Sequence, residues 1–290
     1  MKGMVPIMNF KNVQYETDHM SYNHLTQLIK GETLYTNHSH NYYEVYIFLS
    51  GRGKMIIEGT TYPLKPYTVA IMRPLEFHRL LLEDMCQYER ITIEFSKEFL
   101  NHLDENEQLY VPFHERSLGI TNVFSPIQVQ SSDIMYYISK IEQALISEYD
   151  LKDIIMKVNF ASLLIELSNL FTPIHNNENT LSIDSDFPPV VKDVILYIND
   201  NITSDLSLDI LSTQFYFSKY YLSRVFATAT GHTLHEYIMK KRLLIAKQQI
   251  REGYTTIDAC HSSGFRDYSS FYKAYKKFFS ISPKEESVNP

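Results

Sequence analysis

One sequence pattern occurs twice in the last third of this chain, and it restricts the possible folds more than any other feature. The second copy follows the first at an offset of 49 residues, from Ser218 to Asp267. Each copy comes after a shorter apolar segment and a turn, and a short helix, a turn and a second helix form a helix-turn-helix unit. The pattern therefore predicts two such units in tandem. The matched segments are Ser218–Phe226 with Asp267–Tyr275 and Gly231–Leu234 with Ser280–Pro283, preceded by Leu208–Phe215 and by Ile257–Ser263 with Gly264.

Helical geometry then separates a buried face from an exposed face in each second helix. At about 100° per residue, one face is apolar and the opposite face carries Arg, Lys, Tyr and Ser. Such a mixture of side chains suits contacts in a DNA major groove. The alternative is that the exposed face contacts only solvent. The same arrangement in two helices favours DNA. The expected core residues are Leu222, Val225, Phe226 and Ala229, then Phe271, Ala274, Tyr275 and Phe278; the expected DNA-binding residues are Lys219, Tyr220, Ser223, Arg224, Tyr268, Ser269, Tyr272, Lys273 and Lys276.

The distribution of charge agrees with a nucleic-acid partner for one part of the chain. The whole chain has a formal net charge of −7, which by itself indicates an ordinary acidic protein. Residues 187–290, however, hold 13 of the 27 Lys and Arg residues and only 10 of the 34 Asp and Glu residues. The acidic charge therefore belongs to the N-terminal part, and the C-terminal part is mildly basic.

These C-terminal residues resemble the AraC/XylS-type transcription regulators over about residues 190–284. The resemblance implies two helix-turn-helix subdomains joined by a long helix, here about Leu234–Arg251, with recognition helices about 34 Å apart on one face of duplex DNA. It also implies promoter DNA as a partner, and RNA polymerase if the protein is an activator. Gly264 is retained and is expected to need a positive φ. The matching residues are FSKYYLSRVF (217–226), Gly231, Glu236–Ile238, Arg242–Leu243, Ala246, Ile257, Gly264–Phe265, Asp267, Ser270–Phe271 and Ser282–Pro283; the departures are Ser212, Tyr216, Ala259–Cys260, Ser280 and the missing aromatic-Arg ending beyond Lys284.

The N-terminal half has the composition of a β domain with flanking helices. Residues from about Leu34 to Phe95 form short runs rich in Val, Ile, Tyr and Phe between turn-forming residues, which is typical of a sandwich or small barrel. The expected strands are Glu44–Leu49, Lys54–Glu58, Val69–Met72 and Arg90–Phe95. Two helices follow: one with a stripe of Ile134, Ile138, Ile141 and Leu145, and a more apolar one at about Leu151–Phe171. Each must pack on the barrel or on a second copy of the chain, and we take the first stripe as the candidate dimer surface.

The predicted organisation is a two-domain α+β protein. It comprises an N-terminal cupin-like β-barrel with flanking helices (1–171), which binds an effector and dimerises, a linker (172–189) rich in Asn, Ser, Asp and Pro, and an all-α DNA-binding domain with two helix-turn-helix units (190–290). No apolar stretch approaches the roughly 18 residues of a membrane span, and the N-terminus has no signal-peptide pattern. With two cysteines there is no disulfide framework, so we expect a cytoplasmic protein without a membrane partner.

Histidines in the predicted barrel are the candidate effector or metal residues. His38 and His40, followed by Glu44, resemble the first signature of cupin barrels, and His78 stands where their second signature has its histidine. Alternate residues on a strand point the same way, so these groups are expected to form a three-nitrogen, one-oxygen set suited to a divalent metal such as iron, manganese or zinc. The same imidazoles equally suit contacts with an organic ligand, or a purely structural role.

The second cupin signature is eroded, because Arg73 and Leu75 replace its proline and glycine. Tyrosines near the histidines, among them Tyr46, favour a pocket with apolar walls and polar groups. The resemblance implies a small-molecule sensor, commonly for carbohydrates or related metabolites. We therefore expect a homodimeric, non-enzymatic transcription regulator that responds to a carbohydrate-like effector. The alternatives are a cupin metal-dependent sensor or enzyme fused to a DNA-binding domain, and a regulator that has lost ligand sensing.

Overall fold

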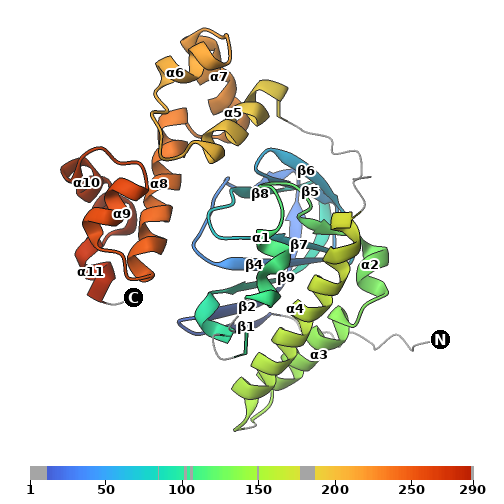
Figure 1. Cartoon of the computed structure of the whole chain (residues 1–290). Helices are drawn as coiled ribbons and strands as arrows, with labels where there is room; N and C mark the ends of the chain where they lie inside the picture. Colours follow the sequence, from blue (N-terminus) through green and yellow to red (C-terminus); the bar gives the residue numbers. More distant parts are fainter. Residues whose placement is uncertain are drawn as a thin grey trace. The chain divides into compact units, whose positions relative to one another are not determined.

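The computed structural model describes residues 12–83, 85–100, 103–104, 107–148, 150–176 and 187–288, which form two compact units made mainly of residues 12–176 and 187–288 (Figure 1). The first unit is rich in β-strands and the second is helical, so the predicted two-domain α+β class is confirmed. Of the expected linker (172–189), residues 172–176 continue the last helix of the first unit, and residues 177–186 lie outside the described residues.

Two sheets build the first unit, and their inner faces share one apolar cluster. The long central strands pair antiparallel in a continuous register, for example Tyr46 with Thr92 and with Ala70. The six-stranded sheet has the order β1 (Val13–Glu16), β2 (Met20–Lys30), β9 (Met85–Phe95), β4 (Tyr43–Ser50), β7 (Thr68–Met72), β10 (Val123–Phe124), and the four-stranded sheet the order β3 (Thr33–Leu34), β8 (His78–Leu82), β5 (Gly53–Ile57), β6 (Thr60–Leu64).

Strand alternation divides the side chains of the six-stranded sheet between two clusters. On β4, Val45 and Ile47 belong to the cluster that includes the helices, whereas Tyr46 and Phe48 belong to the cluster between the sheets. Both faces of β4 are therefore covered, which explains why its sequence is apolar almost throughout. The face between the sheets is where the candidate ligand-binding residues lie.

Helices α3 (Ile134–Leu145) and α4 (Lys152–Asn176) lie side by side along the β-domain (Figure 1). Ile134, Ile138 and Ile141 are almost fully buried in the cluster that joins these helices to the six-stranded sheet. The stripe on α3 is therefore covered within the chain, and its assignment as a dimer surface was wrong. The shorter helical elements are Lys97–Leu100, Gln108–Tyr110, α1 (Val111–His114) and α2 (Pro126–Gln130).

Among the described residues, α4 is the one helix long and apolar enough over Lys152–Phe171 to cross a membrane by length and composition. The core helix of a soluble protein passes the same test. Six residues of α4 belong to the internal cluster with α3 and the sheet, which accounts for much of its apolar composition: Met156, Phe160, Leu163, Leu164, Leu167 and Phe171.

The second unit is entirely helical where its main part, residues 187–288, is described. Polar side chains start most of its helices: the hydroxyls of Ser207, Ser218, Thr233 and Thr255 and the carboxylate of Asp267 each accept a hydrogen bond from a backbone N–H in the first turn. The helices are α5 (Pro189–Asp200), α6 (Leu208–Gln214), α7 (Lys219–Thr230), α8 (Leu234–Arg251), α9 (Thr256–Ser262), α10 (Tyr268–Phe279) and α11 (Pro283–Val288).

Candidate DNA-binding surface and ligand-binding interior

The two repeated segments have the same local structure. Helix α7 begins at the cap Ser218, whose hydroxyl accepts from the Tyr221 N–H at 3.2 Å, and it ends at Gly231 with φ +76°. Helix α10 begins at the cap Asp267, whose carboxylate accepts from the Ser270 N–H at 2.8 Å, and it ends at Ser280 with φ +63°. Both helices have 12 residues, and each follows a short helix and a turn. The 49-residue offset therefore marks two equivalent helix-turn-helix units.

Helix α7 presents most of its predicted DNA-binding side chains to solvent. Lys219, Tyr220 and Arg224 are exposed, and Ser223 is half-buried. The ammonium group of Lys219 forms an ion pair with Asp209 on α6. Arg224 forms no ion pair with any described residue, so its guanidinium group is available to an external acceptor.

Helix α10 is the more basic of the two. Ser269, Tyr272, Lys273 and Lys276 are all exposed. Tyr268 is only half-buried and its hydroxyl donates to Thr256 Oγ1 at 3.1 Å, so this predicted DNA-binding side chain also ties α10 to α9. One expected core residue differs from the prediction: Phe278 is 41% exposed.

The caps give the two helix N-termini different charges. Backbone N–H groups at a helix N-terminus favour a negative charge, and a DNA phosphate can supply one. At α10 the carboxylate of Asp267 already occupies this position, and hydrogen bonds from Ser270 hold its pKa below the ordinary value. At α7 the cap is the neutral hydroxyl of Ser218. A phosphate group is therefore accommodated better at the N-terminus of α7 than at the N-terminus of α10.

The turn before α10 fits tightly against the loop that follows α5. Gly264 has φ +94°, as the sequence predicts. A Cβ atom at this position would lie 2.8 Å from the carbonyl oxygen of Ile202 and 2.9 Å from Nε of Arg242. Arg242 on α8 donates to the carbonyl oxygens of Ile202 at 2.9 Å and Ser204 at 2.6 Å. This junction connects the two helix-turn-helix units.

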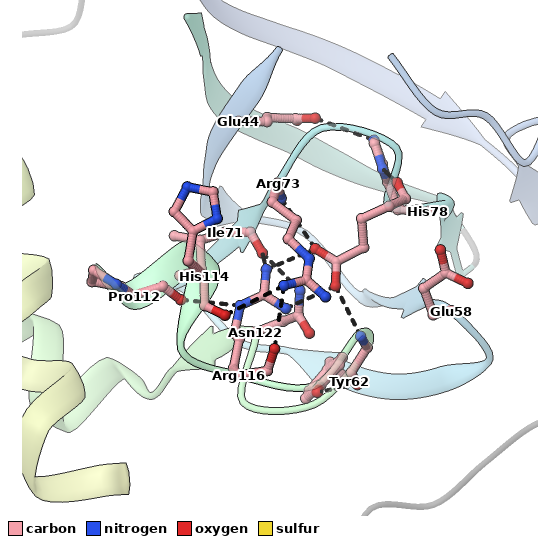
Figure 2. A network of polar contacts seen from close by, with 12 residues as sticks. Glu44, Glu58, Tyr62, Ile71, Arg73, His78, Pro112, His114, Arg116 and Asn122 are labelled. Atoms are coloured by element: carbon pink, nitrogen blue, oxygen red, sulfur yellow. Dashed lines mark hydrogen bonds and ion pairs between the residues drawn. The ribbon is translucent and has the colours of Figure 1, made fainter. Parts of the chain in front are cut away.

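In the first unit, three predicted ligand-binding residues are buried between the sheets. Glu44 is 4%, Tyr46 1% and His78 3% exposed. The His78 Nε2 atom lies 3.1 Å from the Glu44 carboxylate, and its Nδ1 atom lies 2.9 Å from the carbonyl oxygen of Glu76 (Figure 2). Burial alone would lower the pKa of His78, but the charge and hydrogen bond of Glu44 outweigh it and raise this pKa. Glu44 and His78 thus form a buried ion pair.

The other two predicted histidines lie between β3 and β4, in the segment Thr36–Asn41, which groups with the second unit. His38 is exposed, and its Nδ1 atom lies 3.0 Å from the carbonyl oxygen of Thr36. His40 is half-buried, and the centres of the His38 and His40 rings lie 6.1 Å apart. Imidazoles whose ligating nitrogen carries no proton, and carboxylates, are donors that a divalent zinc, iron or manganese ion accepts. The donor set therefore fits the group that the cupin resemblance implies.

A buried ion pair that the sequence did not indicate supports this interior. Arg116 donates two hydrogen bonds of 2.7 Å to the carboxylate of Glu76, and both side chains are almost fully buried. Its Nε also donates to the carbonyl oxygen of Pro112 at 3.1 Å, and Gly119 donates its N–H to Glu76 at 2.8 Å (Figure 2). Burial would raise the pKa of Glu76, but Arg116 lowers it to about 2. The segment 112–119 is thereby attached to β7 and β8.

Strand β9 contributes further interior groups that the sequence analysis did not identify. Tyr88 and Thr92 are buried, and Arg90 lies between them on the same face. The Tyr88 hydroxyl lies 2.8 Å from the Tyr46 hydroxyl. The alternation of residue types along β9 could have revealed them: Tyr88, Arg90 and Thr92 alternate with Ile91 and Ile93, which belong to the cluster with the helices.

Each of the two units matches a known protein family domain. Residues 31–163 match the AraC-like ligand binding domain, and residues 211–286 match a helix-turn-helix domain. The regulatory protein SoxS of Escherichia coli is 30% identical over 97 residues, which are 33% of this chain and 91% of SoxS. The multiple antibiotic resistance protein MarA of Salmonella typhimurium is 29% identical over 99 residues, 34% of this chain and 78% of MarA. The structure of ToxT from Vibrio cholerae aligns with 93% of this chain and 98% of its own at 15% identity, with a TM-score of 0.36.

Two helix-turn-helix units with exposed basic faces and a separate ligand-binding β-domain define a DNA-binding transcription regulator. The chain belongs to the AraC/XylS-type family of transcription regulators, as the resemblance predicts. Its curated relatives SoxS and MarA are described as a regulatory protein and a multiple antibiotic resistance protein.

Proposed function

We propose that this protein is a sequence-specific regulator whose helices α7 and α10 enter the major groove of promoter DNA, and whose β-domain binds a small-molecule effector. The observation that carries the proposal is the equivalence of the two helix-turn-helix units. Both second helices begin at a side-chain cap and end at a residue with positive φ, and both leave a basic face exposed. A pair of such helices supplies base contacts and phosphate contacts at two successive positions along the duplex.

The test uses one charged side chain from each helix. We expect Arg224→Ala and Lys273→Ala each to weaken binding to a target promoter fragment by about 1–3 kcal/mol for a base contact, or less for a phosphate contact. Lys284→Ala is the matched control, because it removes an exposed charge on α11. Fluorescence anisotropy measures the affinity, and far-UV circular dichroism shows that the variants fold. Equal affinities for all four proteins would contradict the assignment.

The proposed effector site comprises Glu44, Tyr46 and His78, and His38 and His40 are further candidates from the sequence. Its buried polar groups support a ligand with polar atoms, and the apolar cluster around Tyr46 supports a ligand with an apolar part. A carbohydrate-like effector is the class predicted from the sequence. In this proposal the protein acts in the cytoplasm without being an enzyme, and it contacts RNA polymerase if it is an activator.

A homodimer is part of the same proposal, but through α4 rather than α3. Exposed apolar residues follow each other at heptad spacing, from Leu151 directly before α4 through Ile154 and Val158 to Ile165 on α4. Such a seam suits helix–helix packing between two copies of the chain. We expect a Val158→Asp, Ile165→Asp variant to be monomeric in size-exclusion chromatography with light scattering. A variant that remains dimeric and folded would move the interface elsewhere.

A metal-dependent sensor is the second candidate, and the three histidines of the cupin-like signatures favour it. In that case His38, His40 and His78 would hold a divalent ion, which would supply a Lewis acid to a bound ligand. Elemental analysis of the purified protein is the test. A content near one zinc, iron or manganese per chain that is lost in His40→Ala would support the metal. A metal-free protein would leave the imidazoles as contacts for an organic effector.

A further inference from the structure

The last described helix of the chain carries a buried carboxylate. Helix α11 (Pro283–Val288) packs on α8 and α10 (Figure 1), and its residue Glu286 is only 1% exposed. A carboxylate buried to this extent requires compensation by other groups. Glu286 also lies beyond Lys284, where the sequence departs from the family pattern, so the resemblance to the family does not account for it.

Three side chains from two other helices compensate this carboxylate. From α8, the Arg251 Nε atom donates to Oε1 of Glu286 at 2.7 Å, and the ammonium group of Lys247 lies 3.6 Å from Oε2. From α10, the Tyr275 hydroxyl donates to Oε2 at 3.2 Å. Burial and the charge of Glu286 raise the pKa of Tyr275, so its hydroxyl remains a donor. The two oxygens of one carboxylate therefore connect α8 to α10.

The start of α11 fixes the direction in which Glu286 points. The Ser282 hydroxyl accepts a hydrogen bond from the Glu285 N–H at 3.2 Å, and the Glu285 carboxylate accepts one from the Ser282 N–H at 2.6 Å. This reciprocal pair is a capping box. The Ser282 carbonyl oxygen also accepts from the Glu286 N–H at 3.1 Å. The helix is short, but its first turn is held next to the residue that carries the carboxylate.

Tyr275 belongs to the buried face of α10, opposite the basic face. It is fully buried in the apolar cluster that α10 shares with α8 and α9, whereas Lys273 and Lys276 are exposed. Apolar packing is non-directional, whereas a hydrogen bond requires a defined distance and angle. A buried ionic group gives little net stability, but it can restrict a structure to one arrangement. The carboxylate can thus hold α10 in one rotation about its axis, which decides where the two lysines point.

Helix α8 contacts the other helix-turn-helix unit near its opposite end. There the Tyr237 ring packs on Phe226 of α7, with ring centres 5.4 Å apart and ring planes at 79°. Arg251 is the last residue of α8, about 20 Å further along the helix axis at the usual rise per residue. Because α8 is one continuous helix, the orientation of α10 on α8 also sets its orientation relative to α7.

We propose that Glu286 is the positioning residue of the second helix-turn-helix unit: its carboxylate fixes the rotation of α10, so that Lys273 and Lys276 face the DNA while α7 is bound. This inference rests on the proposed function, since it concerns how both units engage one duplex. It gives the C-terminal helix a part in DNA recognition, although α11 carries none of the expected DNA-binding side chains.

The first test uses the sign of the effect on DNA affinity. Glu286→Gln keeps the shape of the side chain and removes the negative charge that Arg251 and Lys247 face. If Glu286 acted only through net charge, the loss of an acid would strengthen binding to DNA. We expect the opposite: the full-length variant binds a duplex, selected by the parent protein from a random library, at least about fivefold more weakly. Glu252→Gln is the matched control, because it removes an exposed carboxylate at the end of α8, and its affinity should equal or exceed that of the parent.

Hydroxyl-radical footprinting shows which unit loses its contacts. The parent protein should protect two stretches about one helical turn apart, and Lys273→Ala and Arg224→Ala identify the stretches that belong to α10 and α7. We expect Glu286→Gln to lose protection in the α10 stretch alone, while α10 peptides keep the hydrogen-exchange protection of the parent. Loss of that exchange protection would show that Glu286 serves only stability. That result, equal weakening of both stretches, or unchanged affinity overturns the proposal.

Tyr275→Phe is a milder variant that tests the connection to α10. It removes one hydroxyl and leaves the ring in the cluster, so the unit should fold and the α10 stretch should weaken less than in Glu286→Gln. If Glu286 acts through Tyr275, the double variant binds no more weakly than Glu286→Gln, whereas additive losses contradict the connection. A parent protein that protects no defined stretch refutes the proposed function itself. A normal parent footprint with unchanged variants refutes this inference alone.

Discussion

Replacing Gly264 by alanine tests whether the junction between the two helix-turn-helix units is as tight as the structure shows. The added Cβ atom would lie 2.8 Å from the carbonyl oxygen of Ile202 and 3.0 Å from Cα of Thr203. Both atoms are backbone, so neither can move without shifting the loop after α5. The Cβ atom would also lie 2.9 Å from Nε of Arg242, whose hydrogen bonds hold that loop.

The expected cost has a conformational part and a steric part. A non-glycine residue at positive φ costs about 1–2 kcal/mol, and the lower entropy of the unfolded chain with alanine returns about 0.4–1 kcal/mol. Forcing an extra methyl group into a packed site adds about 1–3 kcal/mol. We therefore expect Gly264→Ala to destabilise the helical unit by about 2–4 kcal/mol.

Gly253 provides a matched control within the same unit. Its φ is +93°, almost that of Gly264, but a Cβ atom there would have no neighbour within 4 Å. Gly253→Ala therefore carries the conformational part alone, about 1 kcal/mol or less. The difference between the two variants isolates the steric part.

Hydrogen exchange of α9 and α10 peptides measures the local stability in the full-length protein, and anisotropy with promoter DNA measures the functional result. We expect faster exchange and weaker DNA binding for Gly264→Ala, because α10 loses its fixed position relative to α7. Gly253→Ala should remain close to the parent protein in both assays. Equal effects of the two substitutions would refute the argument that the junction is sterically closed.

Two further predictions concern the β-domain. Burial would lower the pKa of His24, but its hydrogen bonds to the carboxylates of Glu142 at 2.5 Å and Glu89 at 2.9 Å raise it. The stability that the His24–Glu142 pair contributes is therefore complete below pH about 6.5 and is lost as the pH rises through the higher folded pKa. We expect the protection of α3 peptides from hydrogen exchange to fall toward alkaline pH by more than the ordinary pH dependence of the exchange rate. This fall should be smaller in Glu142→Gln. Arg116→Met should cost about 3–5 kcal/mol in urea unfolding because it leaves Glu76 charged and buried, and adding Glu76→Gln should recover part of that loss; a double variant no more stable than the single one would contradict this.

The helical unit could be predicted almost completely from the sequence because its signals are local. The long helix expected at Leu234–Arg251 has these bounds in the structure, since Thr233 and Glu236 form a capping box at its start. The positive φ of Gly264 was also predictable, because the turn before a recognition helix requires it. Helix caps and turns depend on residues a few positions apart, and such short-range patterns are visible in one sequence.

The β-domain was predicted less completely because its stabilising contacts join distant residues. Strand β2 was missed, since Asn23 and Gln27 occupy its face toward the interior and His24 its other face, so no apolar alternation is visible. His24 is acceptable there only because Glu142 on α3 pairs with it. The stripe on α3 was correctly seen as apolar, but periodicity does not reveal whether α4 or another chain covers it.

In the candidate sites, too, residues in local motifs were predicted and contacts between distant residues were missed. Glu44, Tyr46 and His78 were predicted from a motif and alternate strand positions, and they are buried together. Glu76 and Arg116 were missed because they lie 40 residues apart in the sequence, and only the structure shows that they form a buried ion pair. A sequence shows which charges exist but not which of them are compensated.

The two recognition helices, although equivalent in structure, are unequal in chemistry. Helix α7 offers Arg224, whose planar guanidinium group can bind guanine with two hydrogen bonds, and no described carboxylate pairs with it. Helix α10 offers Lys273 and Lys276, which act as point charges, and its N-terminus is already occupied by the carboxylate of Asp267. We therefore expect α7 to contribute mainly sequence discrimination and α10 mainly phosphate affinity. On that reasoning Arg224→Ala should relax the preference for particular bases, whereas Lys273→Ala should weaken binding to all sequences alike and reduce the salt dependence by about one phosphate contact.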